Sequence, residues 1–224
     1  LKILADKAGV SLERKKETIE SKTTGRLYQI HESAAQYYHN LLLRAPAAEH
    51  AREYVINKRG LTRKTMEDFQ LGFSPGEGLK KHLLELGYSE KELLTARLLG
   101  EREGRIYDLF RHRLMFPIRD IKGRVVGFGA RALDDSMPKY LNSPQTAIFD
   151  KSSILYAIDR AKGAIKEKGL VVIVEGYMDV ITAHQYGFTN VVASMGTALT
   201  EKQIKVLKGF TKVVSLALDP DSAG

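Results

Sequence analysis

The stretch that decides the fold is LVVIVEGYMD at residues 170–179, an apolar run that leads into the acids Glu175 and Asp179. A second apolar run, residues 213–218, leads into Asp219 and Asp221. Both runs are short, rich in β-branched residues and almost uninterrupted, which is typical of strands buried on both faces of a parallel sheet. Carboxylates at the ends of two such strands should converge on the crevice where open α/β sheets bind their ligands.

These four acids predict a metal site. Carboxylates gathered in one crevice repel one another unless a cation lies between them. Mg²⁺ and Mn²⁺ are the natural candidates, because hard cations prefer oxygen ligands. Such a site points to phosphoryl chemistry, in which metal ions stabilise the attacking and leaving oxygens.

Strand and helix patterns alternate around the two apolar runs. A strand at 170–175, a helix at 177–186, a strand at 190–194, a helix at 200–208 and a strand at 213–218 follow one another. Two consecutive βαβ units predict a right-handed, parallel, three-stranded start to a doubly wound sheet.

The residues before this alternation have a different pattern of polar and apolar side chains. Residues 11–25 are polar and have the composition of a linker, and residues 134–146 form a polar loop. Between these segments the patterns predict helices and a small antiparallel sheet. The expected helices are 31–44, 46–60, 79–86, 89 to about 99 and about 152–166, and the expected strands are 105–110, 113–118 and 124–128. Residues 120–123 predict a hairpin-like turn between the last two strands. Capping-box patterns at Ser89/Glu92 and Thr200/Gln203 mark the starts of two of the expected helices. The fold class is therefore α/β, with a mixed α+β N-terminal subdomain followed by a doubly wound parallel sheet.

Composition sets the broad class. The chain has 224 residues, 43% of them hydrophobic and 28% charged, which is ordinary for a soluble globular protein. It has no cysteine, so it contains neither a disulfide nor a thiolate zinc site. No apolar run approaches the roughly 20 residues of a membrane span, and we expect a cytoplasmic protein. Because the chain begins at Leu1 and stops just after Asp221, we expect a fragment of a longer protein.

The net charge of +8 is concentrated in the middle of the chain. Residues 97–168 hold 15 Lys and Arg against 9 Asp and Glu. A basic region beside an acidic metal site suits a polyanion that lies across the first and reacts at the second. Solvated surface lysines are the alternative, and charge alone favours nucleic acid over them.

A dinucleotide-binding fingerprint is rejected. Residues 127–132, GFGARA, satisfy the G-x-G-x-x-A pattern, but Asp134, Asp135 and Pro138 leave no room for the helix that such a fingerprint opens. Glycines in a hairpin strand, where nucleic acid or another backbone approaches closely, are the better interpretation.

The acidic elements carry a family resemblance. A glutamate after the first strand and an Asp-x-Asp after the third resemble the Toprim domain of primases, topoisomerases and related nucleases. The resemblance implies that Glu175, Asp219 and Asp221 hold divalent metal, Mg²⁺ or Mn²⁺, and that Asp179 supports that site. Glu175 is alternatively a general acid or base.

The basic segment narrows the family. HRLMFPIRD at 112–120, GRVVGFGAR at 123–131, PKYLNSP at 138–144 and FDK at 149–151 resemble the RNA-polymerase core of bacterial replicative DNA primase. In that family this half forms a shelf for single-stranded template, RNA–DNA hybrid and incoming nucleotide. The residues expected to contact them are Arg113, Arg119, Arg124, Arg131, Lys139, Asn142 and Lys151. For each arginine the alternative is a surface strand residue held in a salt bridge.

The resemblance also implies a domain organisation. Residues 1–26 would be a linker remnant after a zinc-binding domain absent from this chain, so zinc would be needed only there. Residues 27–166 would be the basic subdomain, and residues 167–224 a Toprim domain incomplete at its C-terminus. The segment that meets the replicative helicase is missing as well.

The implied activity is that of a DNA primase. Such an enzyme is a DNA-directed RNA polymerase, a nucleotidyltransferase that makes short RNA primers on single-stranded template during replication. We expect a monomer that works at the replication fork in the nucleoid. The alternatives are another Toprim enzyme, such as a phage primase–helicase or a nuclease, and a non-catalytic nucleic-acid-binding module.

Overall fold

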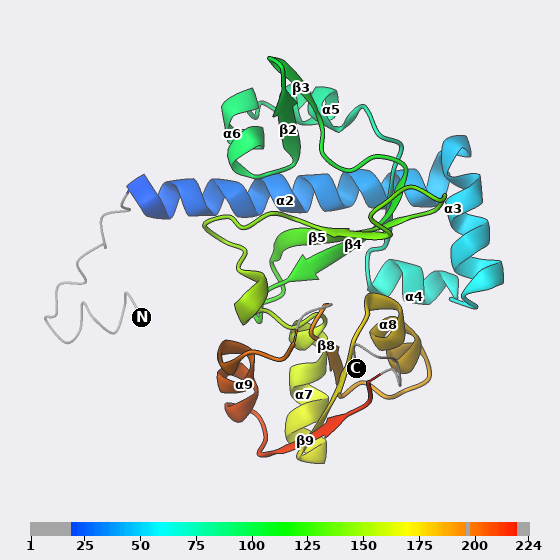
Figure 1. The fold of residues 1–224 in the computed structure, drawn as a ribbon, viewed down its shortest axis with the longest axis vertical. Coiled ribbons are helices and arrows are strands. Elements are labelled where there is room, and N and C mark those ends of the chain that lie inside the picture. The colour runs from blue at the N-terminus through cyan, green and yellow to red at the C-terminus, as the bar shows by residue number, and fades with distance from the viewer. Residues whose placement is uncertain (1–18, 196–197, 219–224) are drawn as a thin grey trace, which may run out of the picture.

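The computed structural model describes residues 19–195 and 198–218. A long helix, α2 (Ile19–Arg44), lies across an antiparallel sheet, and a smaller parallel sheet with its helices lies on the other side of that sheet (Figure 1). No helix among the described residues is both long enough and apolar enough to span a membrane.

Helix α2 begins earlier than the sequence pattern predicts. We expected a linker up to residue 25 and a helix from His31, but residues 19–26 already belong to α2. Tertiary contacts stabilise the polar first turns. Arg26 donates to the Glu92 carboxylate at 2.9 Å, and its guanidinium lies 4.3 Å from the centre of the Tyr88 ring. Residues 1–18 of the expected linker lie outside the described residues.

The remaining helices of the N-terminal half follow their capping signals. Pro46 opens the predicted helical stretch, and Gly60, with a φ of 66°, follows it. The capping box of Ser89 and Glu92 is present, but its helix ends at Thr95 because Arg97 has a left-handed φ of 56°. The elements are the 3₁₀ turn η1 (Pro46–Ala48), α3 (Glu49–Glu53), the π-helical turn η2 (Tyr54–Lys58), α4 (Arg63–Asp68), α5 (Leu79–Glu85) and α6 (Glu90–Thr95).

The antiparallel sheet has the strand order β1-β4-β5-β6. The turn at residues 120–123 joins β4 to β5 as predicted, with Gly123 at a φ of 83°. The sequence patterns did not predict two of its strands, β1 and β6. Strand β6 lies within residues 134–146, where a polar loop was expected. The predicted strand 105–110 instead pairs with residues 99–102 in a separate hairpin. The strands are β1 (Gly72–Ser74), β2 (Leu99–Arg102), β3 (Arg105–Asp108), β4 (Arg113–Arg119), β5 (Val125–Ala132) and β6 (Tyr140–Asn142).

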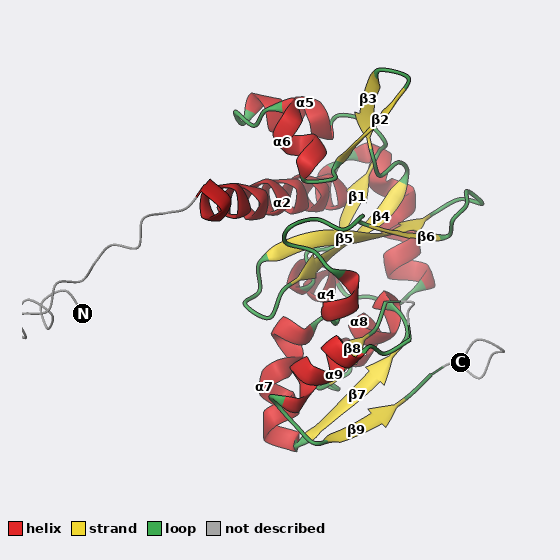
Figure 2. Cartoon of the chain, turned by 60° about the vertical axis from the view of Figure 1, so that its left-hand side comes forward, coloured by secondary structure: helices red, strands yellow, loops and turns green. Residues whose placement is uncertain are grey.

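The predicted alternation after residue 169 is confirmed. Three strands form a parallel sheet in the order β8-β7-β9, with β7 in the centre (Figure 2). Helix α7 packs on this sheet through Ile158, Ala161 and Ile165, so it belongs with the parallel sheet although the expected boundary at 166 would divide it. The elements are η3 (Lys151–Ser153), α7 (Ile158–Lys168), β7 (Leu170–Val174), α8 (Tyr177–Gln185), β8 (Val191–Ala193), α9 (Glu201–Lys208) and β9 (Val213–Leu216).

Strand β9 differs from the expectation that both apolar runs are buried. Val213, Val214 and Leu216 are 57%, 45% and 58% exposed, whereas Val171 and Ile173 of β7 are buried. The reason is its place in the described sheet: among the described residues, β9 pairs only with β7 and lies at the sheet edge.

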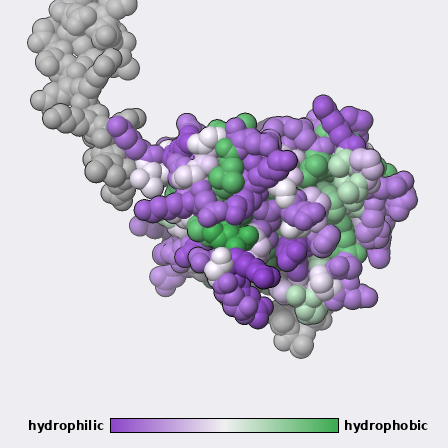
Figure 3. Space-filling view, turned by 90° about the horizontal axis from the view of Figure 1, so that it is seen from above, coloured by the Kyte–Doolittle hydropathy of each residue, from purple (hydrophilic) through white to green (hydrophobic). Residues whose placement is uncertain are grey.

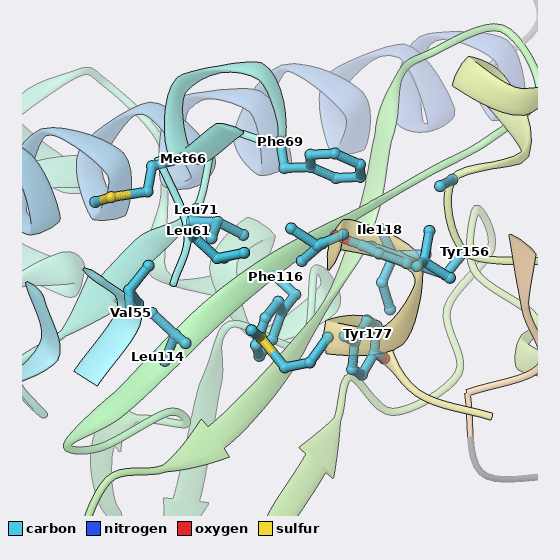
Figure 4. Close-up of a cluster of buried hydrophobic side chains, with 14 of the residues drawn as sticks. Val55, Leu61, Met66, Phe69, Leu71, Leu114, Phe116, Ile118, Tyr156 and Tyr177 are labelled. Carbon is cyan, nitrogen blue, oxygen red and sulfur yellow. The ribbon is translucent and has the colours of Figure 1, made fainter. Parts of the chain in front are cut away.

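One hydrophobic cluster joins the two sheets. It includes Phe116 of β4, Tyr177 of α8 and Tyr156, all nearly inaccessible to solvent (Figure 4). Because apolar burial contributes about 25 cal/mol per Å², this shared cluster ties the two halves firmly together. The far end of the molecule, with α5, α6 and the β2–β3 hairpin, shows a mostly hydrophilic surface with small, separate apolar patches (Figure 3).

Candidate nucleic-acid and metal site

Two of the predicted basic residues lie together at an open cavity of about 770 Å³. Arg131 comes from the end of β5, and Lys139 from the loop between β5 and β6. Lys58 of η2 joins them from the other wall, so three cations from distant segments face one space. The lining also includes His50, Glu53, Tyr54, Asn57, Asp134, Asp135, Ser136 and Met137.

Aromatic rings contact Arg131, which lines this cavity, and Arg59, which follows Lys58 in the chain. The Arg131 guanidinium lies 4.4 Å from the centre of the Tyr54 ring and 5.8 Å from that of Tyr140. Arg59 approaches the same Tyr54 ring at 5.3 Å, and its Nε donates to the Tyr54 hydroxyl at 2.5 Å. Arg131 Nη1 also donates to the Ala132 carbonyl oxygen at 3.0 Å, so ring contacts and hydrogen bonds together fix the positions of both guanidinium groups.

The sequence patterns did not identify Lys58 and Arg59 as candidate site residues. The signal that could have found them is the basic pair directly before Gly60, at the end of a helical stretch.

Burial of the Tyr140 ring raises the pKa of its hydroxyl, so that this group stays neutral beside the cations.

Arg113 is buried and does not line the cavity. It is only 6% exposed, and its Nη1 donates to the carbonyl oxygen of Pro138 at 2.8 Å. Burial lowers its pKa, with Asp134 acting in the opposite direction. Arg113 therefore supports the loop that carries Lys139 from behind.

Arg119 and Arg124 lie at the other end of the β4–β5 hairpin, roughly 20 Å along the strands from Arg113. Arg119 donates to the Gly123 carbonyl at 2.6 Å and also to Gln70 and Glu32. Arg124 donates to Asp120 at 2.8 Å and lies 3.7 Å from the centre of the Tyr28 ring. The structure does not bring these two arginines to the cavity, and their contacts match the salt-bridge alternative.

Lys151 and Asn142 lie apart from the cavity. Lys151 lines a second hollow of about 350 Å³, and burial lowers its pKa. Asn142 Oδ1 accepts a hydrogen bond from the Tyr177 hydroxyl. The rest of this hollow is formed by Ser143, Gln145, Phe149, Asp150, Ser152 and Thr200.

Glu175 and Asp179 lie at the carboxyl end of the central strand of the parallel sheet. Glu175 follows β7 directly and is half-buried. The exposed Asp179 accepts the Gly176 N–H at 3.1 Å, so it caps the first turn of α8. The Ala217 N–H donates to the Ile173 carbonyl at 2.9 Å, which aligns the end of β9 with the strand that carries Glu175.

Asp219 and Asp221 lie outside the described residues. Within the described part, no group of three His, Asp or Glu residues is arranged to hold a metal ion. The donor chemistry nevertheless fits a hard cation, because Glu175 supplies carboxylate oxygens beside the strand that leads to two more carboxylates in the sequence.

Comparison with known families matches both halves of the chain. Residues 37–162 match the N-terminal domain of the DNA primase catalytic core, and residues 169–224 match the Toprim domain. The chain is 45% identical to a DNA primase of Deinococcus radiodurans, over 100% of this chain and 38% of that protein. It therefore spans well under half the length of the curated relatives it matches.

Solved structures with the same fold lead to the same family. The RNA polymerase domain of Mycobacterium tuberculosis primase DnaG superposes with a TM-score of 0.83 at 36% identity, covering 89% of this chain and 68% of that one. A DnaG primase catalytic domain bound to ssDNA gives a TM-score of 0.82 at 40% identity, covering 91% and 64%. The cavity that Lys58, Arg131 and Lys139 share, the parallel sheet with its terminal acid and these likenesses agree, and the chain belongs to the catalytic-core family of bacterial DNA primases.

Proposed function

We propose that this chain is the part of a DNA primase that binds template and nucleotide and carries out nucleotidyl transfer. The observation that carries the proposal is the direct junction between the basic and acidic elements. The β5–β6 hairpin, which bears Arg131 and Lys139, is bonded through Asn142 to Tyr177, two residues after Glu175. The hairpin with the proposed phosphate-binding groups and the segment with Glu175 are thus bonded to each other.

The proposed reaction is RNA synthesis on a single-stranded DNA template. The 3′-hydroxyl of the primer, or of the first nucleotide, attacks the α-phosphorus of a ribonucleoside triphosphate. A new P–O bond forms, the bond to the β-phosphate oxygen breaks, and pyrophosphate leaves. Glu175 either ligates the cation or accepts the hydroxyl proton.

Glu175, Asp219 and Asp221 would hold Mg²⁺ or Mn²⁺, and Asp179 would support them through its cap on α8. The Toprim match supports metal dependence in general. When bound, such a cation lowers the pKa of the attacking hydroxyl and stabilises the charge on the leaving oxygens. The residues themselves supply the carboxylate oxygens at the sheet end.

The basic groups would orient the substrates. Arg131, Lys139 and Lys58 would offer charge-assisted hydrogen bonds to phosphate from one cavity, and Arg59 contacts the same Tyr54 ring as Arg131. Lys151 would contact template or nucleotide from the second hollow. Arg113 would act by supporting the Lys139 loop, and Arg119 and Arg124 would reach only nucleic acid that extends along the hairpin.

The proposed partners are single-stranded DNA, the RNA–DNA hybrid and ribonucleoside triphosphates. Nucleic-acid binding is supported by related primase structures, one bound to ssDNA and one in complex with double-stranded DNA. In the whole protein, a zinc-binding domain before residue 27 and a helicase-binding domain after the Toprim domain would complete the enzyme. We propose that it acts as a monomer at the replication fork in the cytoplasm.

The experiment is primer synthesis on single-stranded DNA with ribonucleotides and Mg²⁺ or Mn²⁺. This chain is compared with a version extended through the rest of the Toprim domain. RNA made by the extended form supports the proposal. DNA cleavage in its place would identify a Toprim nuclease. Single-strand binding without turnover in both forms would leave a non-catalytic binding module.

A further inference from the structure

Tyr177 lies at the junction between the two sheets. It is 3% exposed, and its ring stacks on Phe116 with a centroid distance of 4.9 Å and an interplanar angle of 10°. The ring of Tyr156 meets it edge-on at 4.7 Å (Figure 4). The Tyr177 hydroxyl donates to Asn142 Oδ1, which keeps the amide NH₂ of Asn142 as a donor for another group.

The antiparallel sheet is shaped to receive this ring. Gly129 of β5 pairs directly with Asn142 of β6, and the Tyr177 ring lies against Gly129. A Cβ at position 129 would come within 2.5 Å of Cε2 and of the hydroxyl oxygen of Tyr177. A side chain, and not nucleic acid or another backbone, therefore explains why the strand has glycine here.

Helix α8 is bonded to the N-terminal half at its other end too. Gln185 Oε1 accepts from the Thr62 N–H at 2.8 Å and from the Thr65 hydroxyl at 2.7 Å. Gln185 Nε2 donates to the Gly60 carbonyl at 2.9 Å. With Tyr177 at its first position and Gln185 at its last, α8 is fixed at both ends.

We propose that Tyr177 is a positioning residue that sets the Glu175 loop against the β5–β6 hairpin and orients the Asn142 amide toward the bound nucleotide or template. This inference rests on the proposed function. The physical reason is that Tyr177 is only two residues from Glu175 in the chain, so a shift of the tyrosine ring also shifts the backbone that carries the acid. Small misplacements of reacting groups lower rates strongly, while binding of the remote parts of a substrate is spared.

The test is Tyr177→Phe in the full-length protein, with Tyr156→Phe as the matched control. Each variant removes one buried hydroxyl from the same aromatic cluster, but the Tyr156 hydroxyl has no hydrogen-bond partner among the described residues. Tyr177→Phe should lower kcat for ribonucleotide incorporation roughly tenfold, the upper range for one lost hydrogen bond. Its Kd for a single-stranded template, measured by fluorescence anisotropy, should stay within about twofold of wild type. Tyr156→Phe should keep wild-type kcat.

The outcomes separate the two proposals. Wild-type protein without primer synthesis refutes the proposed function. Active wild type with unchanged kcat in Tyr177→Phe refutes the positioning role. Equal losses of kcat in both variants would also refute the positioning role. So would a Tm of Tyr177→Phe low enough that partial unfolding at the assay temperature explains its kcat loss, because the hydroxyl would then serve only packing.

A double-mutant cycle tests the route through Asn142. If the hydroxyl acts by orienting Asn142, the fold-loss of kcat in the double variant Asn142→Ala/Tyr177→Phe should be smaller than the product of the fold-losses in the two single variants. Independent, multiplicative losses would overturn that route. Gly129→Ala, whose Cβ would displace the Tyr177 ring together with its hydroxyl, should reproduce the loss of Tyr177→Phe.

Discussion

The buried guanidinium of Arg113 donates a 2.8 Å hydrogen bond to the carbonyl oxygen of Pro138, 25 residues later in the chain. Arg113 is at the start of β4 and Pro138 directly precedes Lys139. An arginine predicted to touch nucleic acid thus holds in place the loop that carries Lys139, a lysine with the same predicted role.

The first prediction concerns this support. Arg113→Met keeps the aliphatic stem but removes the donor to Pro138, so the 133–141 segment should exchange its backbone amides faster. Global stability should change by less than about 2 kcal/mol, because the variant loses a charged hydrogen bond and also the cost of burying the charge. Hydrogen-exchange mass spectrometry measures the effect. Arg119→Met, at the far end of the hairpin, is the control and should leave that segment unchanged.

The second prediction concerns phosphate binding at the cavity. Lys139→Ala should weaken binding of single-stranded DNA about equally for all sequences. It should also reduce the slope of log Kd against log salt by about 0.7, the value for one phosphate contact on a single strand. The exposed Lys122, in the turn at the opposite end of the hairpin, provides the control. Equal slopes for Lys139→Ala and Lys122→Ala would assign Lys139 to general surface charge.

The third prediction concerns the metal site. In the full-length protein, Asp219→Ala or Asp221→Ala should abolish primer synthesis while template affinity is retained. The reason is that, in the proposed function, the carboxylates act on the reacting phosphate, whereas Arg131 and Lys139 at the cavity bind the strand. Parallel assays of primer synthesis and template anisotropy check this. Wild-type rates in either variant would remove that residue from the site.

The fourth prediction concerns pH. Burial lowers the pKa of His31 from 6.5 to about 4, and its Nδ1 lies 2.8 Å from the Leu27 carbonyl oxygen. Between these two pKa values the unfolded chain binds a proton that the folded chain does not, so stability rises with pH across this window. The stability that His31 contributes is complete above pH 6.5 and is lost as the pH falls toward 4.

The loss should approach about 3 kcal/mol at pH 4, because each pKa unit corresponds to about 1.4 kcal/mol. Urea unfolding at pH 4.5 and pH 7.5 measures it. His31→Leu keeps an apolar group against Phe128 and should flatten the difference between the two pH values. A variant as pH-sensitive as wild type would mean that other groups cause the dependence.

Local sequence patterns predicted the elements whose signals lie within a few residues. The capping boxes of Ser89/Glu92 and Thr200/Gln203, the turn at 120–123 and the alternation after residue 169 are confirmed. Strand β6 was not predictable, because its three residues form a strand only by pairing with β5. The exposure of β9 likewise depends on its place at the sheet edge, which an apolar run does not reveal.

By itself the sequence determined the fold class, the family resemblance and the residue types of the candidate site, because periodicity, caps and motif order are local properties. Only the tertiary structure decided which cations share a space. Arg131 reaches Tyr54, 77 residues away in the chain, whereas Arg119 and Arg124 turn to ion pairs at the other end of the same hairpin. The bond from Tyr177 to Asn142 also depends on how the two sheets pack, since such contacts form only when distant segments bury a common core.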